Sequence, residues 1–222
     1  MGCALLLVVG CAGMRSEAPQ EEQGRSDRCE GTRTINLAHS ASAPAVLFIT
    51  NDVPGCPNGG LLSGTDERDK LAGLTGEDEV RGLGGSDDVS GGLGGDVIYG
   101  GPGDDVLEAG NALIRTHIPP SDKSKNVLHG GPGSDSVNGD AGDDVLYGGD
   151  GDDKFIWGGM KGADVLYGGD GNDFLNAAAS YGDTRPNKLY CGKGRDKYVA
   201  VKMDYVSSSC EEVAHGGRSF PL

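Results

Sequence analysis

An aspartate recurs about every nine residues through the middle of this 222-residue chain, usually after a glycine-rich stretch. The pattern is clearest around Asp87, Asp96 and Asp105, where consecutive segments read GLGGSDDVS, GGLGGDVIY and GGPGDDVLE. Carboxylate oxygens are the ligands that hard divalent cations prefer. Aspartates stacked in successive repeats would repel one another unless a cation lay between them. The spacing therefore predicts a series of metal sites.

Glycine supplies 41 of the 222 residues, a share that would favour disorder if the glycines were scattered. They are instead periodic, and the phase of the repeat persists over many units. Unbroken units of nine residues begin at Gly64, Gly73, Gly82, Gly91, Gly100, Gly130, Gly139, Gly148, Gly168 and Cys191. A flexible linker would not maintain this phase, so the segment 64–199 is predicted to be an ordered repeat.

The unit resembles the RTX (repeats-in-toxin) nonapeptide GGxGxDxUx, in which U is a large apolar residue. The stretch 191–213 also resembles the end cap of small secreted calcium-binding repeat proteins of actinobacterial type. The resemblance implies an all-β fold, a right-handed parallel β-roll (a β-helix or solenoid) of short strands with calcium-binding turns. Each nonapeptide would form half a coil. Several calcium ions would lie between stacked turns, each held by aspartates and backbone carbonyls of units n and n+2.

Three units are longer than nine residues and predict a difference between the two sides of the roll. They span 109–129, 157–167 and 177–190, and counted from Gly64 all three are even-numbered. The odd side carries Asp69, Asp87, Asp105, Asp135, Asp153, Asp173 and Asp196. The even side carries Asp78, Asp96, Asn126, Asp144, Asp164 and Asn187. All these aspartates except Asp69, whose unit has lost most of its glycines, are candidate metal ligands. Because an amide lacks the negative charge, the even row is expected to bind calcium less completely.

One apolar side chain per unit is predicted to point inward, because side chains alternate across a short strand. The expected core residues are Leu71, Val80, Val89, Ile98, Leu107, Leu128, Val137, Leu146, Phe155, Leu166, Leu175, Leu189 and Tyr198. Such a thin core offsets backbone entropy poorly. The fold is therefore expected to depend on calcium.

The N-terminus predicts export. The apolar run at 4–10 is too short to span a bilayer but suits a secretory signal. The segment 8–11 resembles a bacterial lipoprotein box, which would make Cys11 a lipidated residue; plain secretion and no export are the alternatives. The expected organisation is a signal peptide at 1–11, a tether at 12–28, an N-terminal cap at 29–63, the roll at 64–199, and a C-terminal cap and tail at 200–222. We expect a protein that is extracellular or lipid-anchored at the cell envelope.

Four cysteines remain once Cys3 and Cys11 are assigned to the leader. An even count in an exported chain favours disulfides. Pairing between near neighbours gives Cys29–Cys56 and Cys191–Cys210, one bridge at each end of the roll. Free thiols are the alternative, since no CxxC or CxxH pair suggests zinc.

The function classes are narrowed by charge and by the motifs that the chain lacks. A formal charge of −15 argues against nucleic acid. No HExxH or GxSxG motif occurs, so no enzyme is predicted. Tyr99, Tyr147, Tyr167 and Tyr190 share position nine, either as a contact stripe or by packing between strands. We expect a calcium-binding structural or interaction module of unknown macromolecular partner. The alternatives are a toxin- or adhesin-like protein acting on host cells, or a non-catalytic fragment of an RTX hydrolase.

Overall fold

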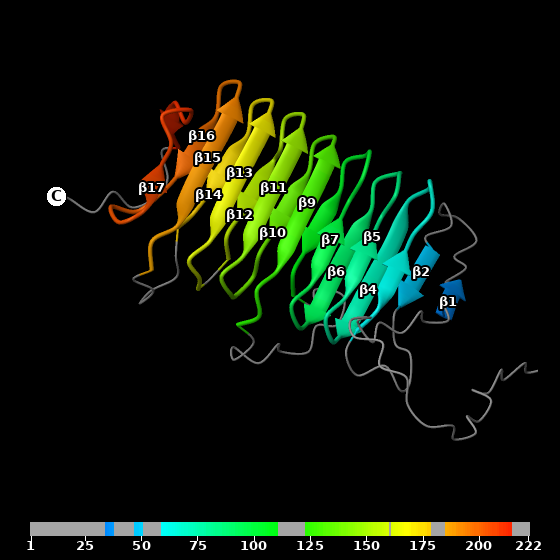
Figure 1. The fold of residues 1–222 in the computed structure, drawn as a ribbon. Helices are drawn as coiled ribbons and strands as arrows, with labels where there is room; N and C mark the ends of the chain where they lie inside the picture. The colour runs from blue at the N-terminus through cyan, green and yellow to red at the C-terminus, as the bar shows by residue number, and fades with distance from the viewer. Residues whose placement is uncertain are drawn as a thin grey trace, which may run out of the picture.

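The computed structural model describes residues 59–110, 123–159, 161–178 and 185–214, together with the backbone of 34–37 and 47–50. Within these ranges short strands alternate between two sheets, and the chain advances along one axis from blue to red in Figure 1. The expected all-β parallel solenoid is thus confirmed. No helix long and apolar enough to cross a membrane occurs in this part of the chain.

The two sheets receive alternate strands. The ten-stranded sheet runs in the order β1 (Thr34–Leu37), β2 (Leu47–Thr50), β4 (Asp69–Thr75), β6 (Asp88–Leu93), β8 (Val106–Glu108), β10 (Ser136–Asn138), β12 (Phe155–Trp157), β14 (Phe174–Asn176), β16 (Lys197–Val199) and β18 (Glu212–Val213). The eight-stranded sheet runs in the order β3 (Leu61–Ser63), β5 (Glu79–Arg81), β7 (Val97–Tyr99), β9 (Val127–Pro132), β11 (Val145–Asp150), β13 (Val165–Asp170), β15 (Lys188–Lys193) and β17 (Tyr205–Val206). Of these described strands, β1 and β2 pair antiparallel, and the other neighbours pair in parallel.

The pairing shows that two nonapeptides make one coil. Odd-numbered units form the ten-stranded sheet and even-numbered units the eight-stranded sheet. The longest expansion, 109–129, leaves this phase unchanged, because Leu107 still pairs with Val137 and Ile98 with Leu128. The prediction that each unit stacks on unit n+2 across the expanded turns is therefore confirmed.

The second glycine of the repeat is required by backbone geometry. Gly149 has a φ of 132°, and a Cβ there would lie closer than 3.0 Å to the backbone of Gly131 in the neighbouring coil. Two early units place leucine at this position, and Leu83 accordingly adopts a φ of 84°. That conformation is strained for a bulky L residue.

The core is a single column of side chains between the sheets, as the repeat predicts. Nearly all of the expected inward residues are 1% exposed or less. Leu62 of β3 joins the column before the first complete unit, and Tyr198 is only partly buried at the far end.

One expected core residue is wrong. Phe155 is partly exposed, and Ile156 takes the inward position with 0% exposure. The register confirms the shift, since Val137 pairs with Ile156 and Ile156 with Leu175. An extra residue, Lys154, follows Asp153, so this odd unit spans 148–157 and the next one 158–167. The glycine pair at 158–159 marks the start of the next unit and could have revealed this shift in the sequence.

Rings at position nine stack along the outer face of the eight-stranded sheet. Successive ring centroids from Tyr99 through His129, Tyr147 and Tyr167 to Tyr190 lie 5.0, 4.5, 4.8 and 5.0 Å apart, with nearly parallel planes. Packing between strands therefore accounts for this stripe. His129 was not expected in it, and burial lowers the pKa of its imidazole.

Candidate metal centre

Each position-six carboxylate lies where a glycine-rich turn leads into a strand. Asp105 immediately precedes β8, and Asp144 immediately precedes β11. The side chain turns inward at this point, so that none of the position-six residues is more than 4% exposed. The buried set comprises Asp69, Asp78, Asp87, Asp96, Asp105, Asn126, Asp135, Asp144, Asp153, Asp164, Asp173, Asn187 and Asp196.

Hydrogen bonds join these residues into two rows that run along the roll. The backbone N–H of Asp135 donates to Asp153 Oδ1 at 3.0 Å, and the N–H of Asp153 donates to Asp173 Oδ1 at 3.0 Å. The even side repeats the pattern through its amides, because Asp164 N–H donates to Asn187 Oδ1 at 2.8 Å. Apart from Asp69, one oxygen of each position-six side chain is thus held by the preceding coil.

The second carboxylate oxygen is buried without a hydrogen-bond partner in much of the set. These atoms are Oδ2 of Asp87, Asp105, Asp135, Asp144, Asp153, Asp173 and Asp196. A buried carboxylate oxygen that lacks a partner is costly, and native proteins satisfy such groups with hydrogen bonds or metal ions. The arrangement recurs at one atom type in one position, which indicates a common ligand.

Backbone carbonyls face the same spaces. A Cβ added to Gly130 would lie closer than 3.0 Å to both Asp135 Oδ2 and the carbonyl oxygen of Gly148. A Cβ on Gly168 would meet Asp173 Oδ2 and the carbonyl oxygen of Cys191 in the same way. In most of the described units, the first glycine therefore keeps open a cradle lined by a carboxylate oxygen and a carbonyl oxygen of the next coil.

Burial makes the charged form of these carboxylates unfavourable. Desolvation, opposed by the backbone hydrogen bond and reinforced by neighbouring carboxylates, raises the pKa of Asp153 to about 7 and that of Asp144 to about 8. The same causes raise the pKa values of Asp87, Asp105 and Asp173 to about 6. A bound divalent cation would reverse this effect, because it stabilises the ionised form.

The donor set fits calcium. Calcium takes oxygen ligands from both carboxylates and backbone carbonyls, the two atom types that line the cradles. In the described ranges no three His, Cys, Asp or Glu side chains converge on one point, so a metal here depends on the carbonyls. Aspartates of adjacent coils would hold each ion. The positive charge of the ion would offset the repulsion between the stacked carboxylates.

The two amides of the even row also donate hydrogen bonds of their own. Asn187 Nδ2 donates to the carbonyl oxygen of Ala177 at 3.1 Å. Asn126 Nδ2 donates to Asp144 Oδ1 at 3.1 Å. In the odd row, Asp69 also differs from the rest, because its Oδ2 accepts from the N–H and the hydroxyl of Thr65 at 2.6 and 2.9 Å.

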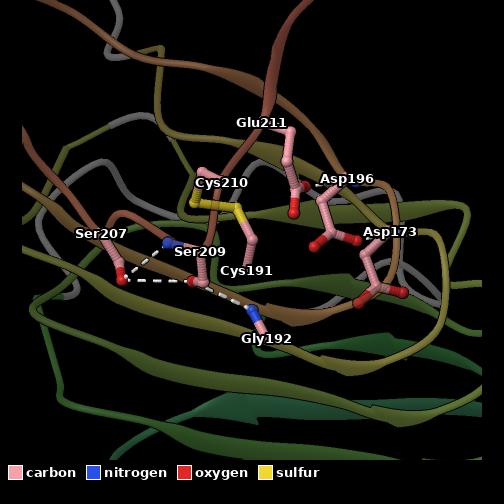
Figure 2. The surroundings of a disulfide bond; sticks show 8 residues. All are labelled: Asp173, Cys191, Gly192, Asp196, Ser207, Ser209, Cys210 and Glu211. Carbon is pink, nitrogen blue, oxygen red and sulfur yellow. Dashed lines mark hydrogen bonds between the residues drawn. A yellow bond between two sulfur atoms is a disulfide. The ribbon is translucent and has the colours of Figure 1, made fainter.

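Two carboxylates that the sequence interpretation missed end the rows. Glu211 Oε2 accepts from Asp196 N–H at 3.0 Å, and Asp204 Oδ1 accepts from Asn187 N–H at 2.9 Å. Figure 2 shows Glu211 beside Asp196, with Asp173 beyond it. Asp204 lies two residues before Val206, and Glu211 lies two residues before Val213. This acid–x–apolar spacing is the end of the repeat motif without its glycines, and it could have revealed both.

The cysteines beside this end are joined. Cys191 and Cys210 form a disulfide with Cα atoms 5.0 Å apart, and Cys191 is fully buried against the core (Figure 2). The bridge ties β15 to the segment that supplies Glu211. The expected Cys29–Cys56 pair and Cys11 lie outside the described residues.

A comparison with protein families agrees with this geometry. The family model of the RTX calcium-binding nonapeptide repeat matches four segments, residues 63–98, 82–112, 124–155 and 159–180. These four segments therefore carry RTX calcium-binding nonapeptide repeats. No curated protein matches the chain.

Proposed function

We propose that this protein is a calcium-dependent structural or interaction module that acts outside the cell and folds when calcium binds. The observation that carries the proposal is the repeated burial of a carboxylate oxygen without a hydrogen-bond partner beside a carbonyl oxygen of the next coil. Calcium is abundant outside cells relative to the affinity range of extracellular calcium modules.

The energetic argument concerns the whole roll. Each unit buries one large apolar side chain, while every ordered residue costs about 1–2 kcal/mol of backbone entropy. Ionised aspartates stacked in adjacent coils add repulsion at neutral pH. Calcium would remove that repulsion and link coil n to coil n+1 through oxygen ligands, so binding free energy would become folding free energy.

Circular dichroism of the full chain at pH 8 tests the proposal. With a chelator we expect a spectrum dominated by disordered chain, and with millimolar calcium a β spectrum with a cooperative thermal transition. Magnesium is the control, because its small octahedral shell suits an all-protein cradle poorly. An unchanged β spectrum and melting temperature after chelation would contradict the proposal.

The proposal also includes export of the protein and its anchoring through a lipid on Cys11. Support comes from the apolar run before Cys11 and from the RTX repeats, which suit a calcium-rich environment. Mass spectrometry of the mature N-terminus would show a diacylglyceryl modification on Cys11 in the native host, and Cys11→Ala would release the protein from the membrane fraction. An unmodified mature chain that begins after Cys11 would support plain secretion instead.

A further inference from the structure

The outer face of the eight-stranded sheet carries no charged side chain at its centre, although the chain has a formal charge of −15. Each strand presents two outward residues, at positions seven and nine of its unit. From β7 to β13 these are four valines, three tyrosines and one histidine: Val97, Val127, Val145, Val165, Tyr99, Tyr147, Tyr167 and His129. All of them are at least partly exposed. An exposed apolar surface that continues over several strands indicates a contact site.

The position-seven column of this face has the same pattern from either end, except for the sign of its charges. From β3 to β17 the column runs Leu61, Glu79, Val97, Val127, Val145, Val165, Lys188 and Tyr205. Each end has an exposed apolar residue, then one charged residue, and then two valines. The column is therefore self-complementary, because a reversed copy would set the acid opposite the base and apolar residues opposite apolar residues.

The position-nine column beside it consists of rings that are already fixed in place. The stacking of Tyr99, His129, Tyr147, Tyr167 and Tyr190 holds each ring against its neighbours. Fixed side chains lose little conformational entropy when a partner binds. Stacking also covers the faces of the rings, against which a sugar would pack, and leaves their edges and hydroxyls for contact. The occupant that this arrangement favours is a protein surface of the same shape.

We propose that this face binds a second copy of the protein, with the two rolls antiparallel. A two-fold axis parallel to the strands, midway between β9 and β11, would relate the copies. The axis sets position seven of one copy against position seven of the other, so that valines meet valines and Glu79 lies opposite Lys188 of the other copy. The strands of the two sheets remain aligned, as they are when sheets pack face to face.

The acidic residues near this face are compatible with the arrangement. Glu79 is held in place by Arg81 of its own chain, whose Nε donates to Glu79 Oε1 at 2.9 Å. Asp170, at one rim of the face, forms an ion pair with Lys193 at 2.7 Å. The proposed axis exchanges β9 and β11, and therefore sets Asp150 opposite Pro132 of the other copy rather than opposite another acid.

The size of the face predicts a weak and reversible dimer. Eight strands about 4.8 Å apart, each presenting three residues of about 3.3 Å with their side chains, give roughly 400–500 Å² on each copy. Stable complexes bury about 800 Å² per partner, and smaller interfaces are transient. The two Glu79–Lys188 pairs would determine the orientation more than the affinity. This proposal rests on the proposed function only because the roll must first be folded by calcium.

Sedimentation velocity of the full-length protein in millimolar calcium tests the proposal. We expect a reversible equilibrium between monomer and dimer as the protein concentration rises from micromolar towards millimolar. Val145→Lys places a cation at the centre of the face and should weaken the dimer at least about tenfold. Val106→Lys is the matched control and should dimerise as the unchanged protein does, because Val106 is a position-seven valine of the other sheet, 43% exposed on β8.

A charge exchange tests the antiparallel orientation. Glu79→Lys and Lys188→Glu should each weaken the dimer, because each sets like charges opposite one another. The double variant restores opposite charges at these positions and should recover most of the affinity. A parallel arrangement of the rolls would not bring positions 79 and 188 together. The absence of recovery in the double variant would therefore overturn the antiparallel arrangement.

Circular dichroism of each variant in calcium separates this proposal from the preceding one. A protein that folds with calcium but remains monomeric at every concentration overturns the dimer alone, as does equal association by Val145→Lys. A folded monomer that sediments with phosphatidylcholine vesicles, and loses this binding in Val145→Lys, would assign the face to a lipid surface instead. A protein that shows no calcium-dependent folding overturns the proposed function.

Discussion

Replacing Asp153 with asparagine should have opposite effects with and without calcium. The side chain is 2% exposed, its Oδ1 accepts a backbone hydrogen bond from Asp135, and its Oδ2 lacks a partner. An amide keeps the first interaction and removes the buried charge. Asn126 and Asn187 already show that the rows accommodate an amide at this position.

The size of the metal-free effect follows from the pKa. Burial raises the pKa of Asp153 from 3.8 to about 7, and each pKa unit corresponds to about 1.4 kcal/mol. At pH 8 the buried charge therefore destabilises the metal-free fold by at most about 4 kcal/mol, and by about 2 kcal/mol once water reaching the turn screens it. Asp153→Asn should recover about that amount.

Two titrations measure the opposite effects. In chelator, trimethylamine N-oxide favours the compact state, and Asp153→Asn should fold at a lower concentration of it than the unchanged protein. In calcium, the variant loses one charge next to the ions that Asp153 is expected to share with Asp135 and Asp173, so the calcium midpoint of folding should rise at least about tenfold. Asp88→Asn is the control, because Asp88 carries an outward charge paired with Lys70 at 2.7 Å and should change either midpoint little. Equal midpoints for Asp153→Asn and the unchanged protein in both titrations would refute the reasoning.

Three further predictions concern the register, the strained turn and pH. Ile156→Ala should cost about 3–4 kcal/mol in calcium, from three lost carbons at about 0.8 kcal/mol each plus a cavity, while Phe155→Ala should cost about 1–2 kcal/mol; urea unfolding in calcium measures both. Leu83→Gly should stabilise the fold by about 0.5–1 kcal/mol in the same assay, because it relieves the φ of 84° at an exposed residue. The metal-free fold should lose stability as pH rises from about 4 to 8, since the unfolded aspartates ionise near 3.8 and the folded ones only near 6–8. Calcium affinity should increase over the same range, because binding requires the ionised form.

Each of these has a clear contrary result. A larger loss for Phe155→Ala than for Ile156→Ala would restore the unbroken nine-residue register. A destabilised Leu83→Gly would mean that the leucine contacts outweigh the strain. A chelated protein that needs less trimethylamine N-oxide at pH 8 than at pH 5 would show that the buried carboxylates do not oppose folding.

The repeat predicted the parallel roll and the coil of two units through its resemblance to the RTX nonapeptide. The inward apolar column and the stacking of Asp105 or Asp144 in rows also agree with local rules, because glycine permits the turn, side chains alternate along a strand, and equal spacing places equal residues above one another. Even the phase across 109–129 could be counted, because Asn126 and Leu128 keep their mutual spacing after the expansion.

Other features depended on contacts between coils. Phe155 and Ile156 are both apolar, and only stacking on Val137 and Leu175 decided which of them faces the core. Asp204 and Glu211 lack the glycines of the motif. Their places at the ends of the rows are shown by the hydrogen bonds that they accept from the backbone N–H groups of Asn187 and Asp196. Periodicity specifies an average unit. A departure from it is resolved only by the neighbouring coils, because those coils determine which hydrogen bonds and which core space a residue can fill.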